Sequence, residues 1–245
     1  MRNVSSGGSA VSATVSAGGS QNLSGGYASG TNLYGVQNVA SGGLASVTSV
    51  NVGGVQDIYS GGSAVSATVS AGGSQNLSGG YASGTNLYGV QNVASGGLAL
   101  GSVVNAGGVQ NVSSGGIASA TSVYTGGTQT VSAGGSASAV TVSGAGASQN
   151  VYGAASGTVV SGGGVQNISA GGIASATSVY TGGTQTVWDG GSATGTTVNN
   201  GGTQYVYDTG RATDTTINAG GNQCVNDGGS VSGTTVSSGG TQNIL

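Results

Sequence analysis

The chain has 245 residues, of which 55 are Gly and none is Pro, His or Phe, and its only charged residues are five Asp and two Arg. The absence of His and Glu excludes most metal sites and most acid–base catalysis, and two positive charges are too few for a surface that binds nucleic acid. Gly does not recur at every third residue, which excludes collagen, and no apolar run approaches the length of a membrane span, so we expect no enzyme, no cofactor and no membrane insertion of this chain.

Glutamine marks an internal repeat along the chain. Of the twelve spacings between successive Gln residues, eight are 19 residues, and each Gln has an aliphatic residue two positions later. With paired Gly and a column of Ala, the unit reads G-G-x-Q-x-V-x-x-G-G-x-A-x-x-T-x-V-x-x. A 19-residue unit is too short to bury a core by itself, but stacked units bury one another's faces. The repeat therefore predicts a solenoid.

The residue types within the unit predict strands. Q-x-V and T-x-V each place two side chains on one face of a short strand, and Gly-Gly supplies a tight corner because Gly adopts left-handed backbone angles without a Cβ clash. The content of Gly, Thr and Val and the lack of a 3.6-residue period exclude a helical solenoid. We predict an all-β, single-stranded parallel β-helix (β-solenoid) of about 13 coils of ~19 residues.

The first half of the chain is internally duplicated. Residues 6–45 and 60–99 are identical over 40 positions. Each copy contains a 16-residue spacing between Gln residues, and we expect the three missing residues around Gly35 and Gly89 to pinch one corner without breaking the stack.

The second half carries another duplication, because GGIASATSVYTGGTQTV occurs at 115–131 and again at 171–187. The chain starts within the pattern at Asn3-Val4 and stops at Leu245, with no polar cap at either end. Solenoids normally need such caps. We therefore expect one solenoid domain over residues 1–245 that is a fragment of a longer rod.

The Gln residues and the aliphatic residues that follow them are expected to face inward. A buried amide needs partners, and the same amide in the next coil supplies them as a ladder. The other inward residues are small, so the bore should be narrow. The expected core ladder comprises Gln37, Gln56, Gln110, Gln129, Gln185, Gln204 and Gln223 with Val39, Val112, Val131, Val187 and Val206.

Serine forms a column directly before the Gly-Gly corners. Hydroxyls spaced by one coil suit a processive O-glycosyltransferase, although Ser also fills turns and keeps a charge-poor surface soluble. Both interpretations remain open from the residues alone. The candidate O-glycosylation sites are Ser6, Ser41, Ser60, Ser95 and Ser114.

Charged and thiol side chains are rare enough to be considered singly. Asp189, Asp208 and Asp227 are one period apart, which predicts either a row of turn residues or a row of oxygen ligands for a cation such as Ca²⁺. The turn is favoured because known Ca²⁺-binding solenoid repeats carry more Asp. Arg211, between Asp208 and Asp214, is expected to form a surface ion pair of little energetic value. Cys224 has no partner for an internal disulfide and is expected to point outward.

The unit resembles the passenger repeat of self-associating autotransporter adhesins of the AIDA and TibA type, from Ser6 to Leu245. The resemblance implies a right-handed β-helix at the bacterial cell surface. It also implies O-glycosylation with heptose by a dedicated heptosyltransferase, adhesion to host cells and self-aggregation. Absent from this sequence are the signal sequence and the C-terminal membrane barrel of such proteins, and it is poorer in Asn and charge than expected for their repeats.

Three functional hypotheses follow. The first is an adhesin passenger that binds other copies and host surfaces through many weak, near-identical contacts that sum to avidity. The second is a passive stalk that spaces a tip domain from the membrane. The third is an ice-binding solenoid, suggested by the Thr pairs 196–197, 215–216 and 234–235; the first Thr of each pair is expected to face inward, and Ser49 and Ser122 interrupt the outward column.

Overall fold

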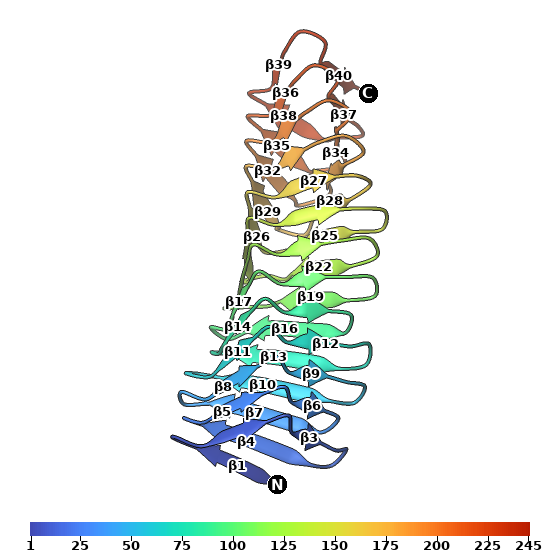
Figure 1. The fold of residues 1–245 in the computed structure, drawn as a ribbon. Coiled ribbons are helices and arrows are strands. Elements are labelled where there is room, and N and C mark those ends of the chain that lie inside the picture. The colour runs from blue at the N-terminus through green and yellow to red at the C-terminus, as the bar shows by residue number, and fades with distance from the viewer. The chain divides into compact units, whose positions relative to one another are not determined.

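The computed structural model describes residues 1–245, which fall into two compact units, Met1–Thr121 (unit 1) and Ser122–Leu245 (unit 2). Both units consist of short strands and tight corners, with no helix. The chain is an all-β parallel β-solenoid of about 13 coils, so the prediction of the fold class is confirmed. Figure 1 shows the successive coils within each unit.

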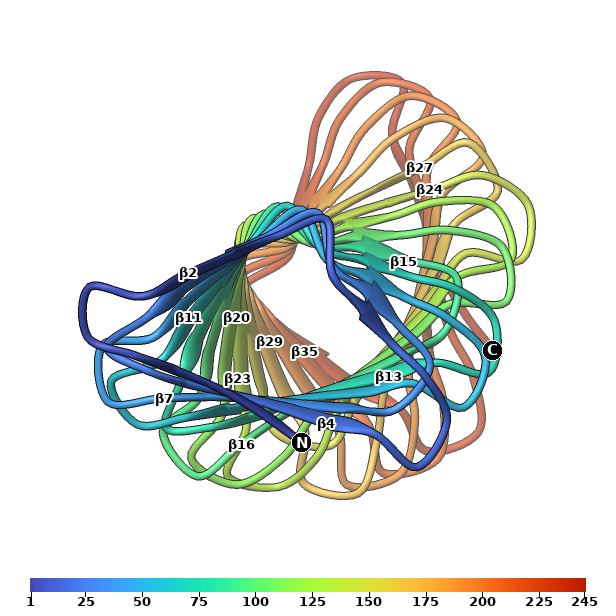
Figure 2. The ribbon, with the colours of Figure 1, turned by 60° about the horizontal axis from the view of Figure 1, so that its bottom comes forward.

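Each coil gives one strand to each of three parallel sheets, A, B and C, and the end-on view shows them as three sides (Figure 2). In unit 1, sheet A contains β1 (Arg2–Ser5), β4 (Ser20–Ser24), β7 (Val36–Ala40), β10 (Val55–Tyr59), β13 (Ser74–Ser78), β16 (Val90–Ala94) and β19 (Val109–Val112). Sheet B contains β2 (Ser9–Val11), β5 (Tyr27–Ser29), β8 (Leu44–Ser46), β11 (Ser63–Val65), β14 (Tyr81–Ser83), β17 (Leu98–Leu100) and β20 (Ile117–Ser119). Sheet C contains β3 (Thr14–Val15), β6 (Asn32–Leu33), β9 (Ser49–Val50), β12 (Thr68–Val69), β15 (Asn86–Leu87) and β18 (Val103–Val104).

Unit 2 repeats the arrangement. Its sheet A contains β22 (Thr128–Val131), β25 (Ser148–Val151), β28 (Val165–Ile168), β31 (Thr184–Val187), β34 (Thr203–Val206), β37 (Asn222–Val225) and β40 (Thr241–Ile244). Sheet B contains β23 (Ser136–Ser138), β26 (Ala154–Ser156), β29 (Ile173–Ser175), β32 (Ser192–Thr194), β35 (Arg211–Thr213) and β38 (Ser230–Ser232). Sheet C contains β21 (Ser122–Val123), β24 (Thr141–Ser143), β27 (Val159–Ser161), β30 (Ser178–Val179), β33 (Thr197–Val198), β36 (Thr216–Ile217) and β39 (Thr235–Val236).

The register places equal positions of the repeat on top of one another. Gln56 pairs with Gln75 in sheet A, and Ala64 pairs with Ala82 in sheet B. The inward positions of the three sheets are thus columns of similar residues, Gln and an aliphatic residue (Val, Leu or Ile) in sheet A, almost only Ala in sheet B, and Val, Leu or Ile in sheet C. Burying each Val or Leu contributes about 1.5–3 kcal/mol relative to leaving it exposed, so the narrow core is stabilised a little by every coil.

The amide columns form hydrogen-bonded ladders inside each unit. In unit 1, Gln56 Nε2 donates to Gln37 Oε1 at 2.7 Å, and Gln75 Nε2 donates to Gln56 Oε1 at 2.7 Å. In unit 2, Gln204 Nε2 donates to Gln185 Oε1 at 2.6 Å. The ladder residues named from the sequence are all buried, and they are Gln37, Gln56, Gln110, Gln129, Gln185, Gln204 and Gln223 with Val39, Val112, Val131, Val187 and Val206.

The Thr column of the repeat has its own partner in this ladder. Thr85 Oγ1 donates to Gln75 Oε1 at 3.2 Å, and Thr196 Oγ1 donates to Gln185 Oε1 at 3.0 Å. In these coils the amide oxygen accepts from the next Gln and from a Thr of its own coil, which uses both of its lone pairs. Ala67 replaces Thr in one coil of unit 1, so Gln56 Oε1 lacks this second donor there.

The corners show why paired Gly is needed. At the corner between sheets A and B, a Cβ atom on Gly62 would collide with the carbonyl oxygen of Val39 in the preceding coil. The residue before it, Gly61, has a φ of 76°, which is a left-handed conformation that costs L-residues with a side chain energy. The second Gly allows close stacking, and the first allows the turn.

The short coils lose their three residues at two corners, whereas the sequence predicts that one corner is shortened. Around Gly35, two residues join β6 to β7 where a full coil uses residues 51–54. The third residue is lost at the preceding corner between sheets A and B, where Gly25-Gly26 join β4 to β5 in place of residues 60–62. The same division recurs in the duplicate that contains Gly89. The shortening falls on two Gly-containing corners, which leaves the inward columns in register.

Candidate interaction surfaces

The candidate O-glycosylation sites lie together on one side of unit 1. Ser6, Ser41, Ser60, Ser95 and Ser114 are all exposed and stand at corners between sheets A and B. Ser41 and Ser95 have φ values of 45° and 50°, and the backbone N–H groups of Ser41 and Ser95 donate to the carbonyl oxygens of Ser60 and Ser114 at 3.3 and 3.1 Å. Ser41 with Ser60, and Ser95 with Ser114, therefore place hydroxyls on adjoining turns that are open to solvent, whereas the coils after Ser6 and Ser60 have Gly25 and Gly79 at this corner.

A second polar column runs along the outer face of sheet A in unit 1. Asn38 Nδ2 donates to Asn22 Oδ1 at 2.7 Å, and Asn92 Nδ2 donates to Asn76 Oδ1 at 2.8 Å. Asn76 Nδ2 in turn donates to Asp57 Oδ1 at 2.8 Å. This outer ladder was not among the residues named from the sequence, although the Asn that directly follows most Gln residues of that half would have indicated it.

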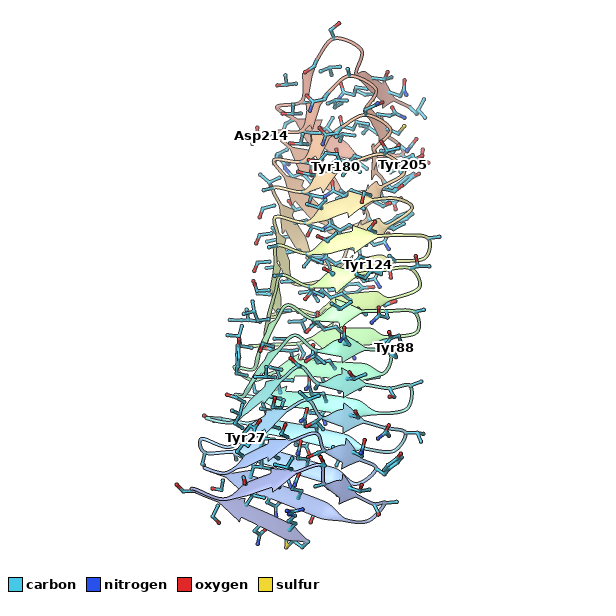
Figure 3. The ribbon with its side chains drawn as sticks, viewed as in Figure 1. Tyr27, Tyr88, Tyr124, Tyr180, Tyr205 and Asp214 are labelled. Atoms are coloured by element: carbon cyan, nitrogen blue, oxygen red, sulfur yellow. The ribbon has the colours of Figure 1, made fainter.

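Large apolar side chains line the outer face of sheet B in unit 1. They stand in register on neighbouring strands, since Tyr27 pairs with Leu44, and Leu98 with both Tyr81 and Ile117. Several are 37–48% exposed, and Tyr27 is labelled in Figure 3. We call this set the apolar stripe, and it comprises Tyr27, Leu44, Tyr81, Leu98, Leu100 and Ile117.

The matching face in unit 2 is mostly polar. The first residues of its sheet B strands are Ser136, Ala154, Ile173, Ser192, Arg211 and Ser230. Ile173 is the large apolar residue among them and is 54% exposed. The stripe is thus a property of unit 1.

Aromatic rings gather instead on the outer side of sheet A in unit 2. The centroids of Trp188 and Tyr207 are 4.8 Å apart with planes 16° apart, and those of Tyr205 and Tyr207 are 5.7 Å apart with planes 17° apart. Figure 3 labels Tyr205 on β34. Burial raises the pKa of Tyr207, with Tyr205 and Cys224 adding to the effect, so its phenol is neutral at physiological pH. We call Trp188, Tyr205 and Tyr207 the aromatic cluster.

The chain is similar to known proteins in both sequence and fold. The family model described as the adhesin of the bacterial autotransporter system, probable stalk (AIDA), matches residues 151–202 and 197–240. A solved structure, the crystal structure of a hyper-glycosylated TibA fragment whose modification is catalysed by TibC, is 45% identical to the chain. It matches with a TM-score of 0.96 and covers 100% of this chain and 91% of that one. The chain belongs to the AIDA-type autotransporter adhesins. No curated protein sequence matches it.

The Asp row of this AIDA-type adhesin lies on successive corners of unit 2. Asp208 and Asp227 have φ values of 55° and 28°, which are turn conformations that Asp tolerates better than most residues. Asp189 accepts a hydrogen bond from Thr209 Oγ1. No group of three or more His, Cys, Asp or Glu side chains comes together in a way that could hold a metal ion.

The ion pair expected for Arg211 from the sequence does not form in the structure. Arg211 lies exposed on β35, and Asp214 has a φ of 54° at the next corner. Cys224 is a free, half-buried thiol. Thr196 and Thr215 are buried and donate to the Gln ladder, which leaves only the second Thr of each pair on the outer face. No helix is long and apolar enough to cross a membrane.

Proposed function

We propose that this chain is a passenger segment that associates with other copies of itself through the apolar stripe of unit 1. The observation that carries the proposal is a row of five large apolar side chains at one position of sheet B, interrupted only at Ser63, with Leu100 two residues further along β17. Exposed apolar surface of this kind marks interaction sites in soluble proteins. The chain carries seven charged residues in all, so charge repulsion between two copies is weak.

The energy of such contact is distributed along the stripe. Five of the six side chains are 37–48% exposed, so the burial of each of these against a second copy contributes about 1 kcal/mol. Several such terms offset part of the cost of association, and further copies add contacts as avidity. Any single outward Ser should accordingly be dispensable.

The introduction of positive charge into the stripe tests this proposal. We expect the triple substitution Leu44→Lys, Leu98→Lys and Ile117→Lys to weaken self-association measured by sedimentation velocity by more than about tenfold, because ammonium groups would be desolvated in the contact. The matched control places the same charge on sheet B of unit 2, as Ser136→Lys, Ser192→Lys and Ser230→Lys. Equal self-association of the two variants, both folded by circular dichroism, would contradict the proposal.

Glycosylation is the second part of the proposed function. The exposed Ser column and the hyper-glycosylated state of the similar TibA fragment support O-linked heptose on Ser6, Ser41, Ser60, Ser95 and Ser114, added by an autotransporter heptosyltransferase. Intact-mass spectrometry of protein from its native cell surface tests it. Regular heptose or hexose increments above the polypeptide mass are expected, and peptide mapping should place them on this column. The bare mass of the polypeptide would refute modification.

The proposed setting is the bacterial cell surface, with the full-length protein anchored in the outer membrane and the passenger facing host cells. Its action is binding without catalysis. Support comes from the adhesin family and from a surface of repeated hydroxyl, amide and apolar columns.

A passive stalk is the second candidate, because the matching family model is itself described as a probable stalk. A stalk binds nothing along its length, so it predicts that the Lys variants self-associate no less than the unmodified sequence. The sedimentation measurement therefore separates the two functions directly.

A further inference from the structure

The aromatic cluster belongs to unit 2, whereas the apolar stripe and the Ser column belong to unit 1. Its rings come from two adjacent coils. Trp188 follows β31, Tyr205 lies within β34, and Tyr207 follows β34. The planes differ by 16° between Trp188 and Tyr207 and by 17° between Tyr207 and Tyr205, so the rings form a nearly parallel stack with Tyr207 in the middle and Trp188 at one end.

The duplicated segments show that these rings lie against the sheet. Thr130 and Thr186 occupy the same position of the 115–131 and 171–187 copies, and both point to the outer face of sheet A. Thr130 is half-buried, whereas Thr186 is only 6% exposed. Thr186 pairs with Tyr205 and precedes Trp188 by two residues, so the aromatic rings cover it. Trp188 itself remains 41% exposed, which leaves one side of the cluster open to solvent.

A carboxylate directly follows two of the three aromatic residues in the chain. Asp189 and Asp208 follow Trp188 and Tyr207 in the chain and occupy equal positions of adjacent coils. Thr209 Oγ1 donates to Asp189 Oδ1, and the backbone N–H of Gly190 donates to Thr209 Oγ1 at 3.3 Å. The Asp189 carboxylate is thereby held at the corner that directly follows Trp188, with an oxygen left to accept further hydrogen bonds.

We propose that this cluster binds a neutral pyranose unit of an oligosaccharide. The C–H face of the sugar ring packs on the face of Trp188 that is not stacked on Tyr207, and the sugar hydroxyls donate to the carboxylates of Asp189 and Asp208. Acidic sugars are disfavoured, because their carboxylates would meet two like charges. A quaternary ammonium fits less well, because cation-binding aromatic cages surround the ion with rings at different angles, whereas these rings are nearly parallel.

Trp188 is the only tryptophan of the chain, so its fluorescence reports directly on binding at this site. Titration of the unmodified recombinant chain with lactose and with cellopentaose is expected to give a saturable change in Trp188 emission with a millimolar Kd. The acidic counterpart 3′-sialyllactose is expected to bind about tenfold more weakly than lactose. Choline serves as the cation probe and should give no saturable change.

Calorimetry with variants locates the site. Trp188→Ala is expected to weaken binding of the better sugar at least about tenfold, and Trp188→Phe, which keeps a ring, should recover part of it. Tyr180→Ala is the matched control, since Tyr180 is 46% exposed at another corner of unit 2; it should bind as the unmodified chain does. Asp189→Asn with Asp208→Asn should bring lactose and 3′-sialyllactose to similar affinity.

Several results would overturn the proposal. They are the absence of saturable sugar binding, equal binding by a folded Trp188→Ala variant, and saturation by choline in preference to either sugar. A separate experiment distinguishes the two possible sources of the bound sugar. A sugar carried by another copy predicts that Trp188→Ala lowers the self-association of glycosylated protein alone, and a host glycan predicts that it lowers binding to host-cell glycoprotein and leaves self-association unchanged.

Discussion

At the corner between sheets B and C, one residue of each coil takes a left-handed conformation. Gly fills this position in several coils, including Gly30 and Gly84 with φ values of 63° and 61°. Val47 occupies it in another coil with a φ of 51°, and its side chain is 55% exposed. A β-branched residue is strained there, and little burial offsets the strain. Gly is therefore the least strained residue at this position of the repeat, and Val47 departs from it.

Replacing Val47 by Gly should stabilise the protein. Relief of the left-handed strain, about 1–2 kcal/mol, exceeds the entropy cost of Gly, about 0.5–1 kcal/mol, so the free energy of unfolding should rise by roughly 1 kcal/mol in urea denaturation. The reverse change, Gly84→Val, is the control. A Cβ on Gly84 would meet nothing closer than Ser66 Oγ at 3.9 Å, so the cost of Gly84→Val comes from the backbone conformation. This substitution should therefore lower the free energy of unfolding. A lower stability for Val47→Gly would show that the valine's contacts dominate.

At the scale of the strand and its ladder, the bore is uncharged. Gln56 sits between Gln37 and Gln75 and has Ala67 in place of a Thr donor. A protonated Glu at this position keeps both ladder bonds, because its O–H donates to Gln37 Oε1 and its carbonyl accepts from Gln75. An ionised Glu loses the donor and is desolvated, so burial raises the pKa of the introduced carboxyl.

Gln56→Glu should therefore make stability depend on pH. The unfolded chain releases this proton near pH 4.3, while the folded state holds it to a higher pH, so stability is retained below pH 4 and falls as pH rises toward the folded pKa. A rise of about three pKa units corresponds to a loss of about 4 kcal/mol by pH 8. Urea denaturation at several pH values measures it. Ser60→Glu, exposed on the same coil, should show almost no such dependence, and equal curves for the two variants would refute the buried ladder.

The elements also show what the sequence could and could not reveal. The 19-residue spacing of Gln and the Gly-Gly pairs predict the strands and the parallel stacking, because every coil must repeat the register of its neighbour. The position of the missing residues in the short coils does not follow from spacing, because a loss at Gly35 and a loss at Gly25-Gly26 shift Gln37 equally. The aromatic cluster was overlooked because Trp188 and Tyr205 depart from the consensus; their proximity requires the register of β31 and β34.

At the scale of the whole molecule, the duplication allows coils to be removed without disturbing the register. Deleting residues 60–113 joins Tyr59 to Ser114, which restores the Tyr-Ser-Gly-Gly sequence found at 59–62. The spacing from Gln56 to the next Gln then returns to 19 residues. The deletion removes Tyr81, Leu98 and Leu100 from the apolar stripe. A deletion of residues 172–228 joins Gly171 to Gly229, keeps the 19-residue spacing and leaves the stripe complete.

These two deletions distinguish adhesion by the stripe from mere length. The avidity of a repeated contact falls with the number of contacts, so removal of 60–113 should weaken self-association in sedimentation velocity by more than about tenfold. Removal of 172–228, which is three residues longer, should change it by less than about threefold. Proportional losses in both variants would place adhesion along every coil, as a uniform polar ladder requires. Unchanged association in both would leave the passive stalk, since a spacer changes reach and not affinity.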